Sequence, residues 1–475
     1  MRAHRPSLPI TLDRTVAGPV YQQIVARLRA AIESGALAPG ARLPASRVLA
    51  TQLGVARGTV ETAYALLVGE GTIVARGAAG TLVSPELAGR GAPVAPPLVR
   101  RGVVPAPPEP IRPFRMGLPA LDAFPRKLWA RLAVREARGL AEADLLHPDP
   151  LGLPALRTAI ASYLGLSRGI QCDAGQVLVT GGFQGGLALI ARTLLRQGDR
   201  AWVEDPGYFL ARDGLLAAGA TLVPVPVDAE GMRVADGVAA AAEARLAVVT
   251  PTHQSALGVA LSLARRLALL AWAEARDGWI VEDDYDGEFR YAGPPLPAMK
   301  SLDRAERVIY AGSFSKVLFP GLRLGYLVLP WGLLDRFASA SLLLQGGQPE
   351  LGQRVVAAFM QEGHFARHLR RMRTLYGRRR AAAASALAEA FGPRLQLTLQ
   401  GGGMHLLARF AGDVPDEELA ARAARAGLAP TALSSLRLRT GGDQGLLLGF
   451  TNVMEDQALP LARRLAAAVE RPGGD

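Results

Sequence analysis

The stretch AGSFSKVLFPGLRLGYLVLP, residues 311–330, decides the fold of the larger part of this chain. Apolar runs stand on both sides of a turn rich in serine and glycine, and Lys316 lies in that turn. Lysine is scarce, because the 54 basic residues include only Lys127, Lys300 and Lys316. A lysine amine can lose its proton and attack a carbonyl carbon, whereas an arginine guanidinium stays protonated. Lys316 is therefore a candidate for covalent chemistry with a carbonyl compound.

The residues around this stretch alternate between predicted strands and predicted helices. From Phe114 onward, helices rich in Ala, Leu and Arg separate short apolar runs: QVLVT (176–180), RAWVED (200–205), RLAVVT (245–250), GWIVEDD (278–284) and RVIYAG (307–312). This alternation predicts an α/β domain with a largely parallel sheet over residues 114–345. Helices and short strands then predict a smaller α+β lobe over residues 346–475.

The first 84 residues have a different pattern, with helices expected over 20–34, 45–53 and 57–69 and two short strands around a glycine-rich turn in TIVARGAAGTLVS (72–84). Two helices joined by a short turn containing glycine are typical of a helix-turn-helix, whose second helix enters the DNA major groove. The candidate DNA contacts are Arg47, Arg57 and Thr59 at the helix starts and Arg76 at the wing. The alternative is a small helical bundle with solvated arginines.

Composition fits such an organisation. Residues 85–113 are rich in proline and lack apolar periodicity, so we expect a linker spanning roughly 60–90 Å at most. The net charge of +12 favours a polyanionic partner. A single cysteine, Cys172, excludes an internal disulfide framework, and no apolar run is long enough for a membrane helix. We therefore expect a cytoplasmic protein with no membrane association.

Further residues complement Lys316. In GWIVEDDYDGEF (278–289), Asp283 at a strand end could keep a pyridine nitrogen protonated, and Tyr285 could donate to a phenolic oxygen. An anionic phosphate needs donors, which Ser313, Arg323 and the backbone amides of Gly181, Gly182 and Phe183 could supply. The set is that of a pyridoxal 5′-phosphate (PLP) site. The alternatives are a metal-binding acidic cluster, a solvated turn and a purely structural turn; no metal is expected.

Both parts of the chain resemble known families. GALAPGARLPASRVLATQLGVARGTVETAY (35–64) is similar to the GntR winged-helix domain. The order of glycine-rich turn, DPGYF, THQ, DDY, SFSK and arginine resembles fold-type I aminotransferases, and the whole chain resembles the MocR/GabR regulators, which fuse the two. The resemblance implies a Schiff base at Lys316, a pyridinium partner at Asp283 and an O3′ contact at Tyr285. It further implies a ring stacked on Tyr208, a ring edge lined by Gln254 or His253, and a phosphate held by Ser313 and Arg323.

This sequence departs from those families where a substrate carboxylate would bind. Leu447 stands where aminotransferases have an arginine, and Leu210 stands where GABA-sensing relatives have one. His147 replaces a tyrosine that often reaches the partner subunit's phosphate, and SALG (255–258) replaces the usual P-T-G. An amino acid would thus lack its usual anchor unless Arg437 or Arg439 serves, and burying an unpaired carboxylate is costly. We hypothesise that PLP, alone or with an unknown amine, is the effector.

These observations predict a homodimeric DNA-binding transcriptional regulator that binds a double-stranded operator and PLP. Two alternatives stay open: an active aminotransferase with an accessory DNA-binding domain, and a constitutive DNA-binding protein in which PLP is structural. The run HLRRMRTLYGRRR (368–380) is either the solvated face of a helix or a surface that attracts DNA phosphates.

Overall fold

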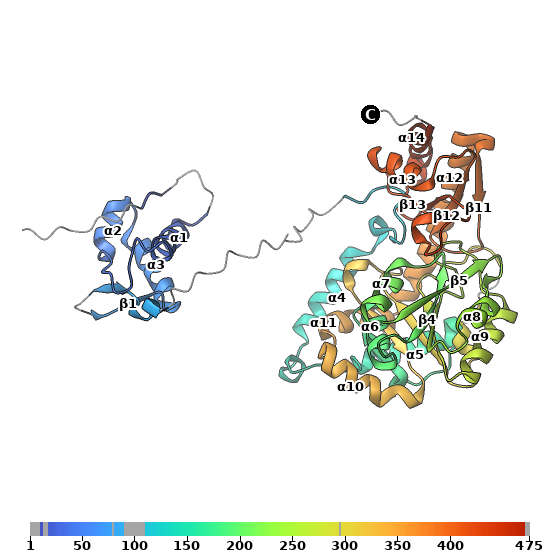
Figure 1. The fold of residues 1–475 in the computed structure, drawn as a ribbon, viewed down its shortest axis with the longest axis horizontal. Coiled ribbons are helices and arrows are strands. Elements are labelled where there is room, and N and C mark those ends of the chain that lie inside the picture. Colours follow the sequence, from blue (N-terminus) through green and yellow to red (C-terminus); the bar gives the residue numbers. More distant parts are fainter. Residues whose placement is uncertain (1–9, 13–17, 78–79, 90–109, 294–295, 471–475) are drawn as a thin grey trace, which may run out of the picture. The chain divides into compact units, whose positions relative to one another are not determined.

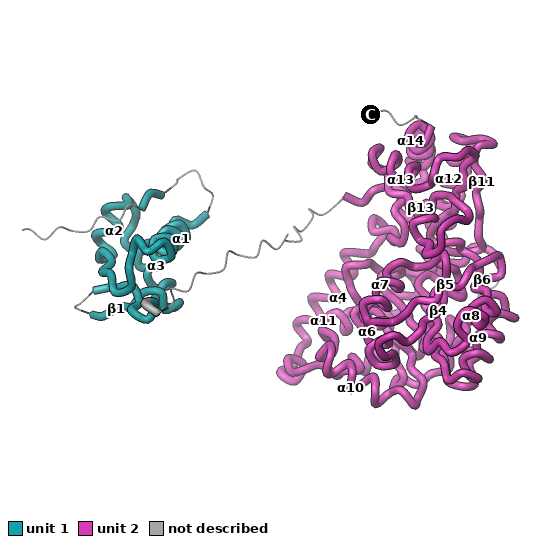
Figure 2. Tube along the Cα trace, in the orientation of Figure 1, with its two compact units in different colours: residues 1–108 teal, residues 109–475 magenta. Residues whose placement is uncertain are grey.

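The computed structural model describes residues 10–12, 18–77, 80–89, 110–293 and 296–470. The chain divides into two compact units, residues 1–108 and 109–475 (Figure 2). Most of the predicted linker, residues 90–109, lies outside the described residues. The bounds predicted for the linker and the domains stay predictions.

The first unit is a winged helix-turn-helix. It consists of α1 (Val20–Glu33), α2 (Ser46–Leu53), α3 (Arg57–Gly69), β1 (Ile73–Ala75) and β2 (Thr81–Val83). Gly54 ends α2 with a φ of 63°, a left-handed conformation that glycine adopts at little cost. Leu28, Leu49 and Val60, one from each helix, are fully buried and hold the three helices together.

The second unit contains an eight-stranded sheet in the order β3-β10-β9-β8-β7-β4-β5-β6. Its strands are β3 (Val177–Thr180), β4 (Arg200–Asp205), β5 (Thr221–Asp228), β6 (Gly231–Met232), β7 (Leu246–Val249), β8 (Trp279–Asp284), β9 (Val308–Ser313) and β10 (Gly325–Val328). The central strands β5, β4, β7, β8 and β9 are parallel, while β10 is antiparallel to both of its neighbours. The largely parallel sheet expected from the sequence is therefore confirmed.

Helices cover both faces of this sheet, which is why its strands are apolar throughout. The helices are α4 (Arg126–Arg138), α5 (Pro154–Arg168), α6 (Gly182–Leu194), α7 (Phe209–Ala217), α8 (Val234–Ala241), α9 (Leu263–Ala275), α10 (Leu334–Gln345) and α11 (Glu350–Gln361). Val203 and Val248 pack with α6, α7 and α10 on one face. Trp202 and Ala247, the residues that precede them, pack with α8 and α9 on the other.

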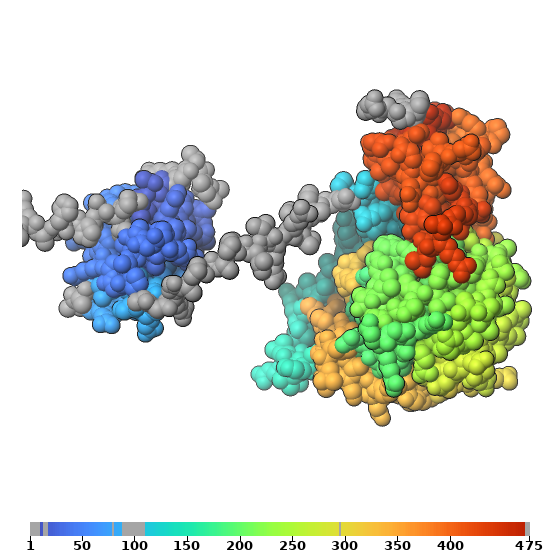
Figure 3. Space-filling model, in the orientation of Figure 1, coloured from blue at the N-terminus to red at the C-terminus, as the bar shows by residue number. Residues whose placement is uncertain are grey.

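A smaller lobe completes the second unit. Its four-stranded sheet has the order β11-β12-β14-β13 and is packed by three helices. The elements are α12 (His364–Phe391), β11 (Leu395–Thr398), β12 (His405–Phe410), α13 (Asp416–Arg425), β13 (Thr431–Ala432), β14 (Leu446–Gly449) and α14 (Ala458–Glu470) (Figure 1). In Figure 3 this lobe forms the orange to red mass beside the green surface of the larger lobe. The preceding helix α11 packs mainly against α4 and α5 and also contacts α12.

The second unit begins with an extended segment that crosses the small lobe. The carbonyl of Pro113 accepts a hydrogen bond from Ala429 N, and Phe114 pairs with Gly449 of β14. Further on, the amide of Ala120 donates to the Tyr376 hydroxyl of α12 over 2.9 Å.

Among the helices in the described ranges, none combines the length and the apolar composition needed to span a membrane.

Candidate functional site

The predicted site residues of the second unit follow strands that end at one edge of the sheet. Tyr208 follows β4, His253 follows β7, Asp283 lies at the end of β8 and Ser313 ends β9. Because these four strands are parallel and adjacent, their carboxyl ends bring the side chains to one edge.

Lys316 lies three residues beyond β9 and is half-buried. Its Nζ donates a hydrogen bond of 2.7 Å to the carbonyl of Gly117. Burial lowers the pKa of Lys316 below its ordinary value, and the negative charges of Asp283 and Asp286 oppose that shift. The lowered pKa increases the fraction of neutral amine, which is the nucleophilic form.

Asp283 is the acid of this run that remains free to meet a ligand. Its side chain is buried, and its Oδ1 has no hydrogen-bond partner among the described residues. Burial and the neighbouring Asp284 raise the pKa of Asp283 well above its ordinary range, whereas Lys316 acts in the opposite direction. A buried carboxylate of this kind gains most from a cationic partner.

The other acids of the run are engaged elsewhere. Glu282 accepts from the amides of Met299 and Lys300, at 2.7 Å each. Asp284 pairs with Arg168 and accepts from the Tyr310 hydroxyl. No group of three or more His, Cys, Asp or Glu side chains in the described part of the chain could hold a metal ion. The acids serve different partners and do not form a common cluster.

Tyr285 belongs to a buried network with histidine. Its hydroxyl lies 2.9 Å from Nδ1 of His253, and Asp286 Oδ2 lies 3.1 Å from the same nitrogen. Burial and the charges of Asp286 and Asp283 raise the pKa of Tyr285 well above its ordinary value, so its hydroxyl keeps its proton. A Cβ at Gly403 would lie 2.0 Å from the His253 ring, so only glycine fits there.

The predicted phosphate donors lie together at the start of α6. Gly182 has a φ of 81°, and Arg323 Nη2 donates to the carbonyl of Gly181 over 3.2 Å. Arg323 has a positive φ of 51°, uncommon for a residue other than glycine and typical of functional turns. Ser313 Oγ accepts from the amide of Ser315 over 3.2 Å and keeps its own proton to donate. The first amides of α6 have no partner within the helix and suit an anion.

Two aromatic rings connect this anion site to the acid. Tyr208 precedes α7, and its ring centroid lies 6.1 Å from that of Phe183 in α6. Burial and the charge of Asp283 raise the pKa of Tyr208 to about 12, while Arg323 lowers it. Tyr208 and Asp283 line the same small cavity, so the structure brings this ring and the acid together.

The Gln254 side chain holds neighbouring loop residues in place. Its amide nitrogen donates to Glu204 and to the carbonyl of Pro206, and its oxygen accepts from the amides of Ala256 and Leu257. These bonds use both ends of the side chain, so its contact with a cofactor ring stays a prediction.

Sequence reasoning missed three groups near this site. Gly117, the partner of Lys316, lies 199 positions away in a segment without a motif. His405 of β12 packs 5.3 Å from His253, between ring centroids, and burial lowers its pKa to about 4. Arg212 of α7 lines a small cavity with Asp283, and its Nε and Nη1 have no partner among the described residues. The sequence signal that could have identified Arg212 is its spacing of four residues, about one helical turn, from Tyr208.

The structure shows the surroundings of the residues that depart from the aminotransferase pattern. Leu447 is fully buried in β14 in an apolar cluster with Leu407 and Leu433. Arg439 donates to the carbonyl of Pro224 over 2.7 Å, and Arg437 donates to that of Asp443 over 3.1 Å. The two arginines proposed as substitute anchors thus have backbone partners instead.

In the first unit, three of the predicted DNA contacts lie at helix starts and the fourth follows a strand. Arg47 is exposed in the first turn of α2, and Arg57 is the first residue of α3, where its Nε bonds Glu61 over 2.7 Å. Thr59 is half-buried in the first turn of α3. Arg76 is exposed after β1, and its amide bonds the carbonyl of Gly80 over 2.9 Å.

Comparison with known proteins places both units. Residues 20–83 match the family described as bacterial regulatory proteins of the gntR family, and residues 125–443 match aminotransferase class I and II. The probable rhizopine catabolism regulatory protein MocR of Rhizobium meliloti is 40% identical over 94% of this chain and 92% of its own length. The HTH-type pyridoxine biosynthesis transcriptional regulator PdxR of Corynebacterium glutamicum is 35% identical over 94% of this chain and 96% of its own.

Solved structures similar to the second unit include aminotransferases. Kynurenine aminotransferase of Pyrococcus horikoshii is 29% identical, with a TM-score of 0.69 over 76% of this chain and 91% of its own. LysN, the α-aminoadipate aminotransferase of Thermus thermophilus complexed with N-(5′-phosphopyridoxyl)-L-leucine, is 28% identical, with a TM-score of 0.69 over 75% of this chain and 91% of its own.

Proposed function

This chain belongs to the MocR-type transcriptional regulators, which join a GntR winged helix to a PLP-binding fold-type I aminotransferase domain, and on that premise we propose that PLP captured at Lys316 is the effector. Capture changes the affinity of a homodimer for its operator. The observation that carries the proposal is the buried acid Asp283. Its Oδ1 has no hydrogen-bond partner among the described residues, and its negative charge opposes the lowering of the Lys316 pKa by burial.

The residues of the site fit the cofactor. When bound, PLP supplies an aldehyde for a Schiff base and a pyridine ring that withdraws electrons. Lys316 would present its amine, Asp283 would hold a proton at the pyridine nitrogen, and the protonated Tyr285 would donate toward the ring oxygen. Arg323, Ser313 and the first amides of α6 would bind the phosphate, and Tyr208 would cover the ring. His253 and Asp286 keep the Tyr285 hydroxyl in place.

The surroundings of the expected carboxylate anchors support PLP over an amino acid as the effector. Leu447 is buried among apolar side chains, and the guanidinium groups of Arg437 and Arg439 bond backbone carbonyls. A carboxylate placed beside these groups would be desolvated without a dedicated partner, which is unfavourable. An amine without a carboxylate would not meet this obstacle.

An exposed leucine patch supports the homodimer. The patch consists of Leu145, Leu146, Leu342, Leu343 and Leu344, whose exposed fractions range from 54% to 82%. The chain ties the ends of its two segments together, because the Ser341 hydroxyl, next to Leu342, donates to the carbonyl of Pro150, four residues after Leu146. Clustered exposed leucines mark protein interfaces.

The patch has a direct test. We expect Leu146→Asp with Leu343→Asp to give monomers in light scattering, whereas Leu166→Asp, an isolated leucine with 93% exposure on α5, leaves the dimer intact. Dimers of the double variant would contradict this assignment.

The effector is tested by gel shift with the full-length protein and the DNA upstream of its own gene. We expect operator affinity to change as PLP is titrated, and the change to disappear in Lys316→Ala. Such coupling requires that PLP bind the two DNA-affinity states unequally. Equal affinity with and without PLP would favour the constitutive alternative, and a response to an amino acid alone would exclude PLP as the effector.

Transamination is the second candidate function, favoured by the retained set of Lys316, Asp283 and Tyr285. Mixing the PLP-loaded protein with single amino acids tests it, because turnover converts the bound cofactor to its amine form and bleaches the visible absorbance. A stable absorbance with every amino acid excludes this activity.

A further inference from the structure

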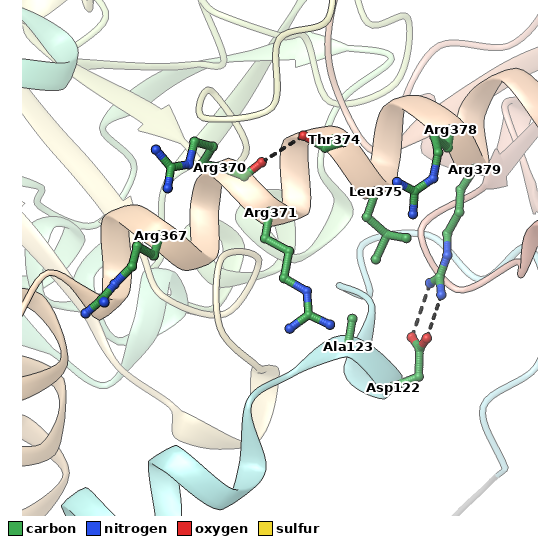
Figure 4. Close-up of a pocket in the computed structure, with 9 residues that line it drawn as sticks. All are labelled: Asp122, Ala123, Arg367, Arg370, Arg371, Thr374, Leu375, Arg378 and Arg379. Atoms are coloured by element: carbon green, nitrogen blue, oxygen red, sulfur yellow. Dashed lines mark hydrogen bonds and ion pairs between the residues drawn. The ribbon is translucent and has the colours of Figure 1, made fainter.

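A groove lined by arginines runs along α12 from Arg367 to Arg379, beside the segment that holds Asp122 and Ala123. It encloses about 660 Å³ and is lined by Arg367, Arg370, Arg371, Arg378 and Arg379, together with the acid Asp122 (Figure 4). Arg367 and Arg378 are separated by three helical turns, a distance of roughly 16 Å along the axis. The site residues described above do not belong to this groove.

The charge of this groove is only partly compensated. Asp122 forms a two-bonded pair with Arg379, and Arg378 pairs with Glu455 over 2.9 Å. The guanidinium groups of Arg370 and Arg371 have no partner among the described residues, and both side chains are exposed.

At the other end of the groove, the nearby acid Glu362 is already paired. It bonds Arg135 over 2.6 Å, whereas Arg367 contacts His364 and backbone carbonyls. Within the described ranges, three arginines of the groove therefore face solvent without a carboxylate of their own: Arg367, Arg370 and Arg371.

The arrangement of these side chains suits an extended polyanion. In Figure 4, Arg367, Arg370 and Arg371 spread apart along the helix and do not converge on one point. A single small anion needs convergent donors, whereas a nucleic acid strand presents one phosphate per about 3.4 Å of its axis. The three arginines without a carboxylate span four residues of α12, about 6 Å along its axis, so they can face two to three successive phosphates of one strand.

The opposite face of α12 holds the helix in place despite this charge. His368, Met372 and Tyr376 are buried against the domain, so the helix is anchored and its arginines are kept at a fixed surface. Arginine is also the side chain whose planar donors match phosphate oxygens.

We infer that the arginine groove of α12 is a second DNA-binding surface, which contacts the phosphate backbone outside the half-sites bound by the winged helices. The inference rests on DNA binding by the first unit. It assigns the groove no base specificity, since phosphate contacts add affinity and orientation but carry no sequence information.

The experiment measures operator affinity of the full-length protein against salt, on two duplexes. One covers only the paired half-sites, about 25 bp, and the other extends the same sequence to about 80 bp. The variant Arg367→Gln/Arg370→Gln/Arg371→Gln removes three charges from the groove. The matched control, Arg196→Gln/Arg276→Gln/Arg304→Gln, removes three exposed charges elsewhere on the same unit.

On the long duplex, we expect the groove variant to lower the salt slope by about two to three units, because each neutralised phosphate contributes about 0.9 to that slope. On the short duplex its slope should equal that of the wild type, which also shows that it is folded. The control variant should match the wild type on both duplexes.

An unchanged slope of the groove variant on the long duplex overturns the inference. An equal decrease in the control variant also overturns it, because general charge would then be the cause. A groove variant that binds DNA normally but loses thermal stabilisation by inorganic phosphate would identify a small-anion site instead. If the wild type binds neither duplex, DNA binding by the first unit fails as well.

Discussion

Replacing Asp283 by asparagine keeps the shape of the side chain and removes its charge. In the proposed complex the buried Asp283 carboxylate would face the pyridine nitrogen, and truncating one partner of a buried charge pair costs about 2–5 kcal/mol. Burial has raised the pKa of Asp283, so part of that energy is spent on ionising it. We therefore expect the lower end, about 2–3 kcal/mol, which is roughly 30–150-fold weaker PLP binding.

The assay is a PLP titration followed by the visible absorbance of the lysine-bound cofactor, with Glu282→Gln as the matched control. Glu282 is the preceding residue on β8, and burial raises its pKa to about 7, but its carboxylate bonds the amides of Met299 and Lys300. The control should bind PLP within a few-fold of wild type. Wild-type affinity in Asp283→Asn would refute the pairing of this acid with the pyridine nitrogen.

Three further outcomes are expected. Lys316→Ala abolishes the visible absorbance of the PLP-treated protein, whereas Lys300→Ala, a lysine paired with an aspartate, retains it; absorbance in both variants would contradict the assignment. Because burial lowers the pKa of Lys316, the rate of PLP capture in stopped-flow absorbance rises with pH and levels off below the ordinary lysine pKa; a rise centred at about 10.5 would refute the shift. Arg168→Met leaves Asp284 buried without its ion pair and lowers the free energy of unfolding in urea by about 3–5 kcal/mol, and a decrease below about 1 kcal/mol would show that the pair is dispensable.

The sequence predicted the fold well because local patterns determine it. The three helices of the first unit begin and end within about one residue of their predicted bounds, since Gly54 and the glycine-proline turn before α2 interrupt the apolar periodicity. The parallel sheet followed from continuous apolar strands. The antiparallel pairing of β10 was not predicted, because the length of the connection between two strands does not by itself determine their relative direction.

The site was predictable where its residues stand beside strand ends. Asp283, Tyr285 and Ser313 were identified because a strand carries each of them to the same edge of the sheet. Gly117 and His405 were missed, because both reach the site from segments distant in sequence and without a motif. Gln254 illustrates the opposite case. The THQ motif identifies it as a candidate site residue, but only its hydrogen bonds in the structure show that it supports a loop.

The segment that opens the second unit connects the Lys316 amine to the small lobe. The carbonyl of Gly117 accepts a hydrogen bond from the Lys316 amine, and only a few residues earlier Pro113 and Phe114 are tied to the small lobe. If the amine leaves this carbonyl to bind the proposed cofactor, we expect the segment to lose one of its attachments. The loss would be detected as faster amide exchange confined to residues 114–120.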